Sequence, residues 1–170
     1  MPIELLPSTA AERPILENLL QLYLYDLCDF GGELPDERGR FSYPELSHFW
    51  TDPGSHPFLI RVDGRLAGFA RVSNVSRIHT PFEGHSVAEF FVLRGCRRNG
   101  VGTWAATRLF DLFPGRWEIA TPASNVPAIA FWRSVSQRYT GGRYEEVWAT
   151  QDGWRGTIES FVSPSAHRSQ

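Results

Sequence analysis

Residues 85–113 constrain the fold more than any other segment, because a strand pattern leads directly into a glycine turn and then into a helix pattern. The strand pattern covers His85 to Leu93, and the helix pattern covers Thr103 to Phe113. Between them, Gly100 and Gly102 let the backbone turn sharply and approach a ligand closely. The first turn of the helix offers unpaired N–H groups and a positive dipole end. The segment therefore predicts a site for a phosphate or pyrophosphate group.

The rest of the chain predicts one domain over residues 1–162 and a polar tail over residues 163–170. Thr9 and Glu12 have capping-box spacing, and Pro14 indicates that the regular helix starts there. Asp63-Gly64 is a hairpin dipeptide between two strand patterns. We expect strands at residues 1–6, 58–62, 66–75, 85–93, 117–121, 143–150 and 156–162, and helices at residues 14–27, 42–50, 103–113 and 127–139.

This order of elements, β-α-α-β-β-β-α-β-α-β-β, predicts a mixed α/β (α+β) sheet with helices on both faces. Regular alternation in the strand at residues 85–93 would place His85, Glu89 and Phe91 on one face, and Phe90 and Val92 on the other.

Composition excludes several classes of function. Basic and acidic residues number 17 and 19, which gives a net charge of −2 and argues against binding nucleic acid or an anionic membrane. All the basic residues are arginine, so Schiff-base chemistry and a phosphate-binding P-loop lysine are excluded. Two cysteines, Cys28 and Cys96, predict neither a disulfide framework nor a metal site. The first residues have no signal-peptide pattern, so we expect a cytoplasmic protein.

Three phosphate-binding motifs compete for the glycine turn. Gly95 and Gly100 have P-loop spacing, but Val101-Gly102 replaces the required Lys-[Ser/Thr], so that motif fails. Residues 100–105 fit the dinucleotide pattern G-x-G-x-x-A, with Glu118 as a candidate ribose carboxylate. Too few strands and helices follow this pattern for two mononucleotide-binding halves, and a hairpin precedes it.

The third motif is Arg97-x-x-Gly100-x-Gly102, which follows the strand Phe90-Phe91-Val92 and precedes Asn125-x-x-Ala128. Together with the order of elements, it resembles the GNAT superfamily of acyl-CoA-dependent N-acetyltransferases over nearly the whole chain. The resemblance implies a largely antiparallel sheet, acetyl-CoA as cosubstrate without a metal, and direct acetyl transfer to an amine.

The resemblance also implies how coenzyme A is held. Backbone N–H groups of residues 98–103 would bind the pyrophosphate, and the strand at Phe90–Val92 would pair with the pantetheine arm. The Val92 N–H would donate to the thioester carbonyl, and Asn125 would face the pantetheine. Trp132 stands where many members have a tyrosine, and its indole cannot supply a proton near neutral pH. The residues assigned to the cofactor are Phe90, Phe91, Val92, Arg97, Arg98, Asn99, Gly100, Val101, Gly102, Thr103, Asn125 and Trp132.

Val92 and Glu89 are the candidate catalytic residues. Glu89, three residues before Val92, is the first candidate base, and an ion pair with Arg71 is the alternative interpretation. His85 and His79 are weaker candidates, and Ala120 removes one position where some relatives carry a base. Acidic residues cluster in residues 26–37 and could attract a cationic amine, although a solvated acidic loop is the favoured explanation.

The resulting hypothesis is an acetyl-CoA-dependent N-acetyltransferase that acts on a primary amine of a small molecule or a protein. A coenzyme A-binding sensor without catalysis and a small dinucleotide-binding protein are the alternatives. We expect a small-molecule or peptide amine as partner, neither nucleic acid nor membrane, and we leave a homodimer open.

Overall fold

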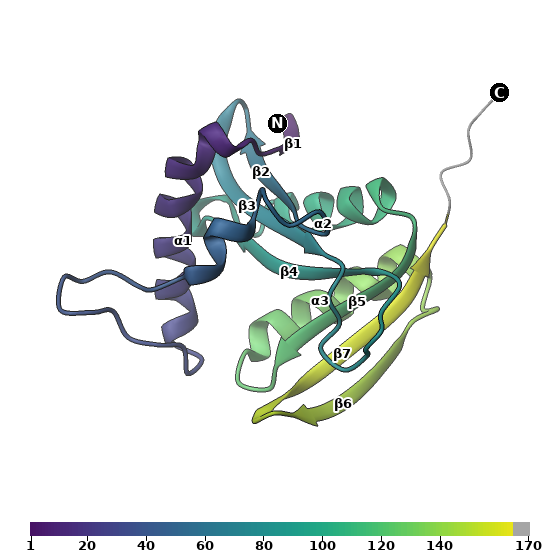
Figure 1. The fold of residues 1–170 in the computed structure, drawn as a ribbon. Helices are drawn as coiled ribbons and strands as arrows, with labels where there is room; N and C mark the ends of the chain where they lie inside the picture. Colours follow the sequence, from purple (N-terminus) through teal and green to yellow (C-terminus); the bar gives the residue numbers. More distant parts are fainter. Residues whose placement is uncertain (165–170) are drawn as a thin grey trace.

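The computed structural model describes residues 1–164, which form one seven-stranded sheet in the order β1-β2-β3-β4-β5-β7-β6 (Figure 1). Its strands are β1 (Ile3–Pro7), β2 (His56–Val62), β3 (Arg65–Ser73), β4 (His85–Val92), β5 (Gly115–Pro122), β6 (Glu145–Gln151) and β7 (Trp154–Ser163). The helices are α1 (Arg13–Cys28), α2 (Val101–Leu112) and α3 (Val126–Thr140), and short 3-10 segments are η1 (Ala10–Glu12), η2 (Pro44–His48) and η3 (Arg94–Cys96).

The predicted fold class is confirmed, because the elements follow the expected order and β4–β5 is the only parallel pair within residues 1–164. A doubly wound parallel sheet is absent from residues 1–164, so the dinucleotide-binding alternative has no support in the fold. The segment expected as a second helix is the 3-10 segment η2. The proposed tail begins at Ser163, which is the last residue of β7, and residues 165–170 of the tail lie outside the described part of the chain.

Local sequence signals set several element ends. The Thr9 N–H donates to the Glu12 carboxylate at 2.9 Å, and α1 starts around Pro14. The Asn125 side-chain oxygen accepts a hydrogen bond from the Ala128 N–H at 3.2 Å and caps α3. Asp63 and Gly64 have φ of 50° and 74°, the conformation that a two-residue hairpin turn requires.

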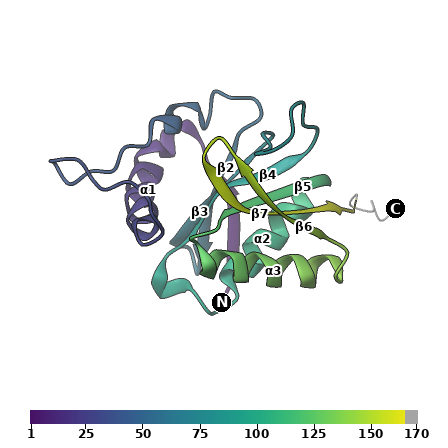
Figure 2. The ribbon, with the colours of Figure 1, turned by 90° about the horizontal axis from the view of Figure 1, so that it is seen from below.

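The helices cover opposite faces of the sheet. On one face, α1 and η2 pack on β2, β3 and β4 through a cluster that includes Leu16, Leu20, Phe69 and Phe91. On the other face, α2 and α3 pack through a cluster that includes Phe110, Trp117 and Trp132. Figure 2 shows α1 standing apart from α3, which runs beside β6 and β7. None of the helices in residues 1–164 is long and apolar enough to cross a membrane.

A β-bulge in β4 corrects the predicted alternation of that strand. Arg71 pairs with Glu89, but Val72 pairs with Val87, so Ala88 is an extra residue opposite β3. Residues before the bulge therefore change face relative to those after it. His85 packs against the rings of Phe113 and Trp117, on the face of α2 and α3, whereas Glu89 faces α1. The expectation that His85 shares a face with Glu89 is wrong for this reason.

Glu159 is a buried carboxyl in the centre of β7. Its side chain is 1% exposed, and neither carboxyl oxygen has a hydrogen-bond partner among residues 1–164. Burial raises the pKa of Glu159 from 4.5 to about 7, because removal from water disfavours the charged form, and the nearby charge of Glu146 raises it further. The folded protein therefore keeps this proton up to about pH 7, whereas the unfolded chain releases it above about pH 4.5.

The pKa shift of Glu159 predicts a pH-dependent effect of Glu159→Gln. The free energy of unfolding falls as pH rises from about 4.5 to about 7, by at most roughly 3 kcal/mol, because only the unfolded state releases the proton in this range. Glu159→Gln should change the free energy of unfolding little near pH 4.5 and raise it by about 2 kcal/mol at pH 8. Urea unfolding at both pH values measures the difference. Glu145→Gln, a change at an exposed position on β6, should have little effect at either pH. An equal gain for Glu159→Gln at both pH values would refute the raised pKa of Glu159.

Candidate active site

The site lies where β4 and β5 separate. These two parallel strands pair only at His85 with Trp117 and at Ser86 with Glu118. Each strand remains paired along its other side, β4 with β3 and β5 with β7, so the sheet splits between them (Figure 1). The rest of β4 has no neighbouring strand on the β5 side within residues 1–164. This edge offers free backbone groups to an extended ligand.

The peptide groups of Phe90 and Val92 point toward the split. Leu93 N–H donates to the Ala67 carbonyl at 2.8 Å, which makes these two residues a hydrogen-bonded antiparallel pair. Residues in such a ladder alternate, so the N–H and C=O groups of Val92 and Phe90 face away from β3. The Val92 carbonyl accepts a hydrogen bond from Arg97 Nε at 2.7 Å. The Val92 N–H therefore points into the split, where it can donate to a carbonyl oxygen of a ligand.

The turn after β4 exposes a row of backbone N–H groups. Arg98 and Gly100 have φ of 65° and 79°, and this alternation curls the chain into a concave turn before α2. The first hydrogen bond of the helix runs from Trp104 N–H to the Gly100 carbonyl at 2.9 Å. Within the described chain, the N–H groups of residues 98–103 donate to no protein acceptor. Together with the positive end of α2, they form an arrangement suited to an anion.

Asp26 of α1 holds two of the three arginines near this turn. Arg94 donates to one Asp26 oxygen through Nε at 3.0 Å and through Nη2 at 2.8 Å. Arg97 Nη2 donates to the other oxygen. Arg98 makes no ion pair with another residue in the 1–164 range, so its charge is available to an anion. The contacts of Asp26 also dock the C-terminal half of α1 against the turn.

A cavity of about 630 Å³, called the slot below, runs along the free edge of β4. Ten of the twelve predicted cofactor residues line it; Asn99 and Val101 do not. Val101 is buried against Val92 and Ala105, so only its backbone can take part in binding. Residues outside the predicted cofactor set also line the slot: Tyr23, Asp26, Leu27, Asp29 and Phe30 from α1 and the turn after it, Arg94, and Pro127, Ala128, Phe131 and Arg138 from α3. The sequence indicated Asp26 and Asp29 for a cationic amine, but it did not indicate Leu27, Pro127 or Phe131.

Aromatic rings form the α3 side of the slot. Phe90 stacks on Phe131 with ring centroids 5.8 Å apart and meets Trp132 edge-on at 5.0 Å. Trp132 is almost fully buried, so its ring fills space at this end of the wall. A Cβ at Gly102 would lie 3.2 Å from the Phe131 ring, so a glycine keeps the first turn of α2 close to this wall. This side of the slot suits an apolar chain.

Glu89 is buried and does not line the slot. Arg71 donates to it through Nε at 2.5 Å and Nη2 at 3.2 Å, and the Tyr43 hydroxyl donates to the same carboxylate. Burial alone would lower the pKa of Arg71, but its contact with Glu89 raises that pKa above the ordinary value. The structure therefore contains the predicted alternative, the ion pair with Arg71, and any role of Glu89 in proton transfer requires an intermediary.

The two histidine candidates lie outside the slot. Burial lowers the pKa of His85, whose ring packs against Phe113 and Trp117. His79 Nε2 lies 3.4 Å from the buried carboxylate of Glu118, which Arg116 and Ser76 also contact. Glu118 thus anchors the loop between β3 and β4. No group of three or more His, Cys, Asp or Glu side chains suited to a metal occurs in residues 1–164.

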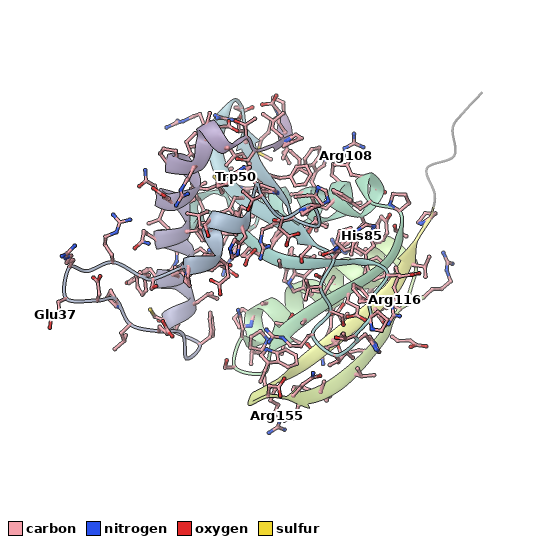
Figure 3. All side chains as sticks on the ribbon, viewed as in Figure 1. Glu37, Trp50, His85, Arg108, Arg116 and Arg155 are labelled. Atoms are coloured by element: carbon pink, nitrogen blue, oxygen red, sulfur yellow. The ribbon has the colours of Figure 1, made fainter. Side chains whose placement is uncertain are left out.

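The acidic segment at residues 26–37 divides into two parts. Asp26 and Asp29 line the slot, and the Ser124 hydroxyl, just before α3, donates to the Phe30 carbonyl at 2.7 Å. Asp36 accepts hydrogen bonds from the N–H groups of Arg38 and Arg40 and organises the loop after α1. Figure 3 shows Glu37 at the tip of this loop, away from the sheet. Only the first part of the segment is placed to affect a ligand in the slot.

A split sheet with a free strand edge and unpaired N–H groups at a helix start is typical of a class of acyltransferase folds. Comparison with known proteins identifies the family. Residues 19–135 match the model of the acetyltransferase (GNAT) family, and the chain belongs to this family. The sequence matches none of the curated proteins with which it was compared.

Three solved structures illustrate the similarity. The aminoglycoside acetyltransferase AAC(6′)-Ib with ribostamycin and coenzyme A has a TM-score of 0.69 and 12% identity, over 100% of this chain and 98% of that chain. Spermidine N-acetyltransferase from Vibrio cholerae with coenzyme A and spermine has a TM-score of 0.63 and 11% identity, over 95% of each chain. The ribosomal-protein-S18-alanine N-acetyltransferase from Escherichia coli has a TM-score of 0.63 and 16% identity, over 99% of each chain. At these identities, the likeness shows the fold.

The contact between β3 and β4 behind the slot predicts the effect of Gly68→Ala. A Cβ at this position would lie 2.0 Å from the Phe91 carbonyl oxygen, so the alanine must push the two strands apart. We expect a loss of about 2–4 kcal/mol in the free energy of unfolding, measured by urea denaturation. Gly64→Ala provides the control: it has φ of 74° but no atom within 4 Å of its Cβ, so it should cost only about 1 kcal/mol. Equal losses would show that the close contact at Gly68 is unimportant.

Proposed function

We propose that this protein is an acetyl-CoA-dependent N-acetyltransferase that transfers an acetyl group directly to a primary amine of a small molecule or a protein. The observation that carries the proposal is the continuity of the free edge of β4 with the unpaired N–H groups of residues 98–103. Coenzyme A combines a pyrophosphate with an extended amide-containing arm, and these two features fit the two halves of the slot. Membership of the acetyltransferase family and the coenzyme A complexes of structural neighbours support the same ligand.

Each half of the slot has its own task in this proposal. The N–H groups of residues 98–103 and the charge of Arg98 bind the pyrophosphate. The peptide groups of Phe90 and Val92 hydrogen bond to the pantetheine arm, and Asn125 faces it from the start of α3. Phe131 and Trp132 cover its apolar part. Bound in this way, acetyl-CoA supplies a thioester that an amine can attack.

Val92 and Glu89 act on the reaction itself. The Val92 N–H donates to the thioester carbonyl and stabilises the negative charge that develops on its oxygen. Glu89 accepts the proton that the amine must lose, through an intermediary because it lies behind the slot wall. Asp29, at the open end of α1, contributes a negative charge that attracts a cationic amine. The slot holds donor and amine together, which lowers the entropic barrier to their reaction.

The acceptor is proposed as a class, a primary amine. The neighbours named above include enzymes for spermidine and for a ribosomal-protein alanine, and a complex with ribostamycin. A suitable panel is therefore spermine, ribostamycin and a peptide with an N-terminal alanine. Each is mixed with protein and acetyl-CoA, and release of free thiol is followed. Thiol release with at least one amine, together with the acetylated amine, supports the enzyme.

A second candidate function is a coenzyme A-binding module without catalysis. Two observations favour it: Glu89 is already paired with Arg71, and Trp132 offers no labile proton on the α3 side of the slot. Tight binding of acetyl-CoA with no thiol release across the whole panel would favour this second candidate over the enzyme.

The turn before α2 predicts the effect of Gly100→Glu. A glutamate there places bulk and negative charge beside the N–H groups that would bind the pyrophosphate. We expect affinity for acetyl-CoA to fall by at least about 100-fold, measured by calorimetry, because one repelling charge replaces a favourable anion site. Gly100→Ala separates this effect from backbone strain, since Gly100 has φ of 79° but nothing within 4 Å of its Cβ. The alanine should cost less than about tenfold. Unchanged affinity in a folded Gly100→Glu protein would contradict the proposed phosphate site.

A further inference from the structure

Coenzyme A carries a second phosphate group, the 3′-phosphate of its ribose, which adds up to about two negative charges at neutral pH. In the proposed function, on which this inference rests, the N–H groups of residues 98–103 and Arg98 hold the pyrophosphate. Both phosphate groups are attached to the same ribose, at its 3′ and 5′ positions, so a site for the 3′-phosphate must adjoin the pyrophosphate turn. A cation in that place would bind it.

One arginine of the slot is free for such a contact. Arg94 and Arg97 both bind Asp26, and the carboxylates that line the slot lie at the C-terminal end of α1. Arg98 stands at the pyrophosphate turn. Arg138 of α3 also lines the slot, and it forms no ion pair or side-chain hydrogen bond with another residue of the described range 1–164. The α3 side of the slot therefore carries a positive charge without a compensating carboxylate.

The arrangement of α2 and α3 brings Arg138 within reach of the turn. Phe131 and Arg138 both line the slot and are about two helical turns apart, or about 10 Å along α3. At Phe131, α3 meets the first turn of α2, since a Cβ at Gly102 would lie 3.2 Å from the ring. Farther along, the rings of Tyr139 and Phe110 are 5.1 Å apart, so the helices run side by side in the same direction (Figure 2). Helical side chains lean toward the helix N-terminus, which directs the Arg138 guanidinium back toward the turn.

We propose that Arg138 binds the 3′-phosphate of coenzyme A and makes the protein select coenzyme A over dephospho-coenzyme A, which lacks that group. The planar guanidinium can donate two parallel hydrogen bonds to phosphate oxygens. The three parts of the cofactor then follow one another along the slot: pantetheine at the free edge of β4, pyrophosphate at the turn before α2, and 3′-phosphate between α2 and α3. Affinity for the acyl donor therefore depends on its adenosine end, far from the thioester.

Other arginines of α2 and α3 are less suited. Arg133 donates to Glu146 through Nε at 2.7 Å and through Nη2 at 2.6 Å, and it lies outside the slot. Arg108 is exposed on α2 and lies outside the slot as well. A structural role is the alternative for Arg138, because a cation in the last turn of a helix interacts favourably with the helix dipole. That role would not distinguish two ligands that differ by one phosphate group.

The test measures the dissociation constants of coenzyme A and dephospho-coenzyme A by calorimetry. The wild-type protein should bind coenzyme A at least about tenfold more tightly. Arg138→Gln should weaken the binding of coenzyme A by about tenfold and leave that of dephospho-coenzyme A unchanged, so that the preference nearly disappears. Arg98→Gln should weaken the binding of both ligands by a similar factor, because its charge acts on the pyrophosphate that they share.

Arg108→Gln is the matched control, since it removes the same charge from an exposed position outside the slot (Figure 3). Both dissociation constants should equal those of the wild-type protein. Equal affinity of the wild-type protein for the two ligands would overturn the inference, as would equal losses with both ligands or an unchanged preference in Arg138→Gln. Wild-type protein that binds neither ligand would overturn the proposed function and this inference together. A preference for coenzyme A without thiol release on the amine panel would overturn the enzyme alone.

Discussion

The separation of β4 from β5 is the constraint on which the rest of the structure depends. Hydrogen bonding between two strands is favourable, so a parallel pair that ends after two residue pairs needs a cause. Here each strand belongs to its own antiparallel block, β1 to β4 on one side and β5 to β7 on the other. The blocks diverge beyond these two pairs, and one hydrophobic cluster with α2 and α3 spans both blocks. The gap exposes peptide groups that elsewhere in the sheet are satisfied within the protein.

Three buried glutamates show how position decides what a carboxyl can do. Glu118 has partners on three sides and anchors a loop. Glu159 has no hydrogen-bond partner among residues 1–164, and burial raises its pKa until it is half-protonated near neutrality. Glu89 has Arg71 and Tyr43 as partners. Its buried charge is therefore compensated within the protein.

Much of the site could be predicted because it lies in one continuous segment. The strand, turn and helix at residues 85–113 follow from hydrophobic period and glycine position, and ten of the twelve assigned residues line the slot. The residues that α1 and α3 add to the slot beyond Asn125 and Trp132 were not assigned to the cofactor. Tyr23 and Leu27 have the helical spacing of core residues, and spacing cannot distinguish a side chain that faces a core from one that faces a cavity. The bulge at Ala88 was likewise invisible, since the strand pattern is regular on both sides of it.

By itself, the sequence determined the order of elements, the hairpin at Asp63-Gly64, the cap at Asn125 and the anion-binding turn, because each depends on neighbouring residues and on backbone preferences. The tertiary structure decided which distant groups meet. Whether Glu89 pairs with Arg71 or faces the slot depends on strand register and on where α1 packs. Those features follow from the burial of the whole sheet, to which every element contributes at once.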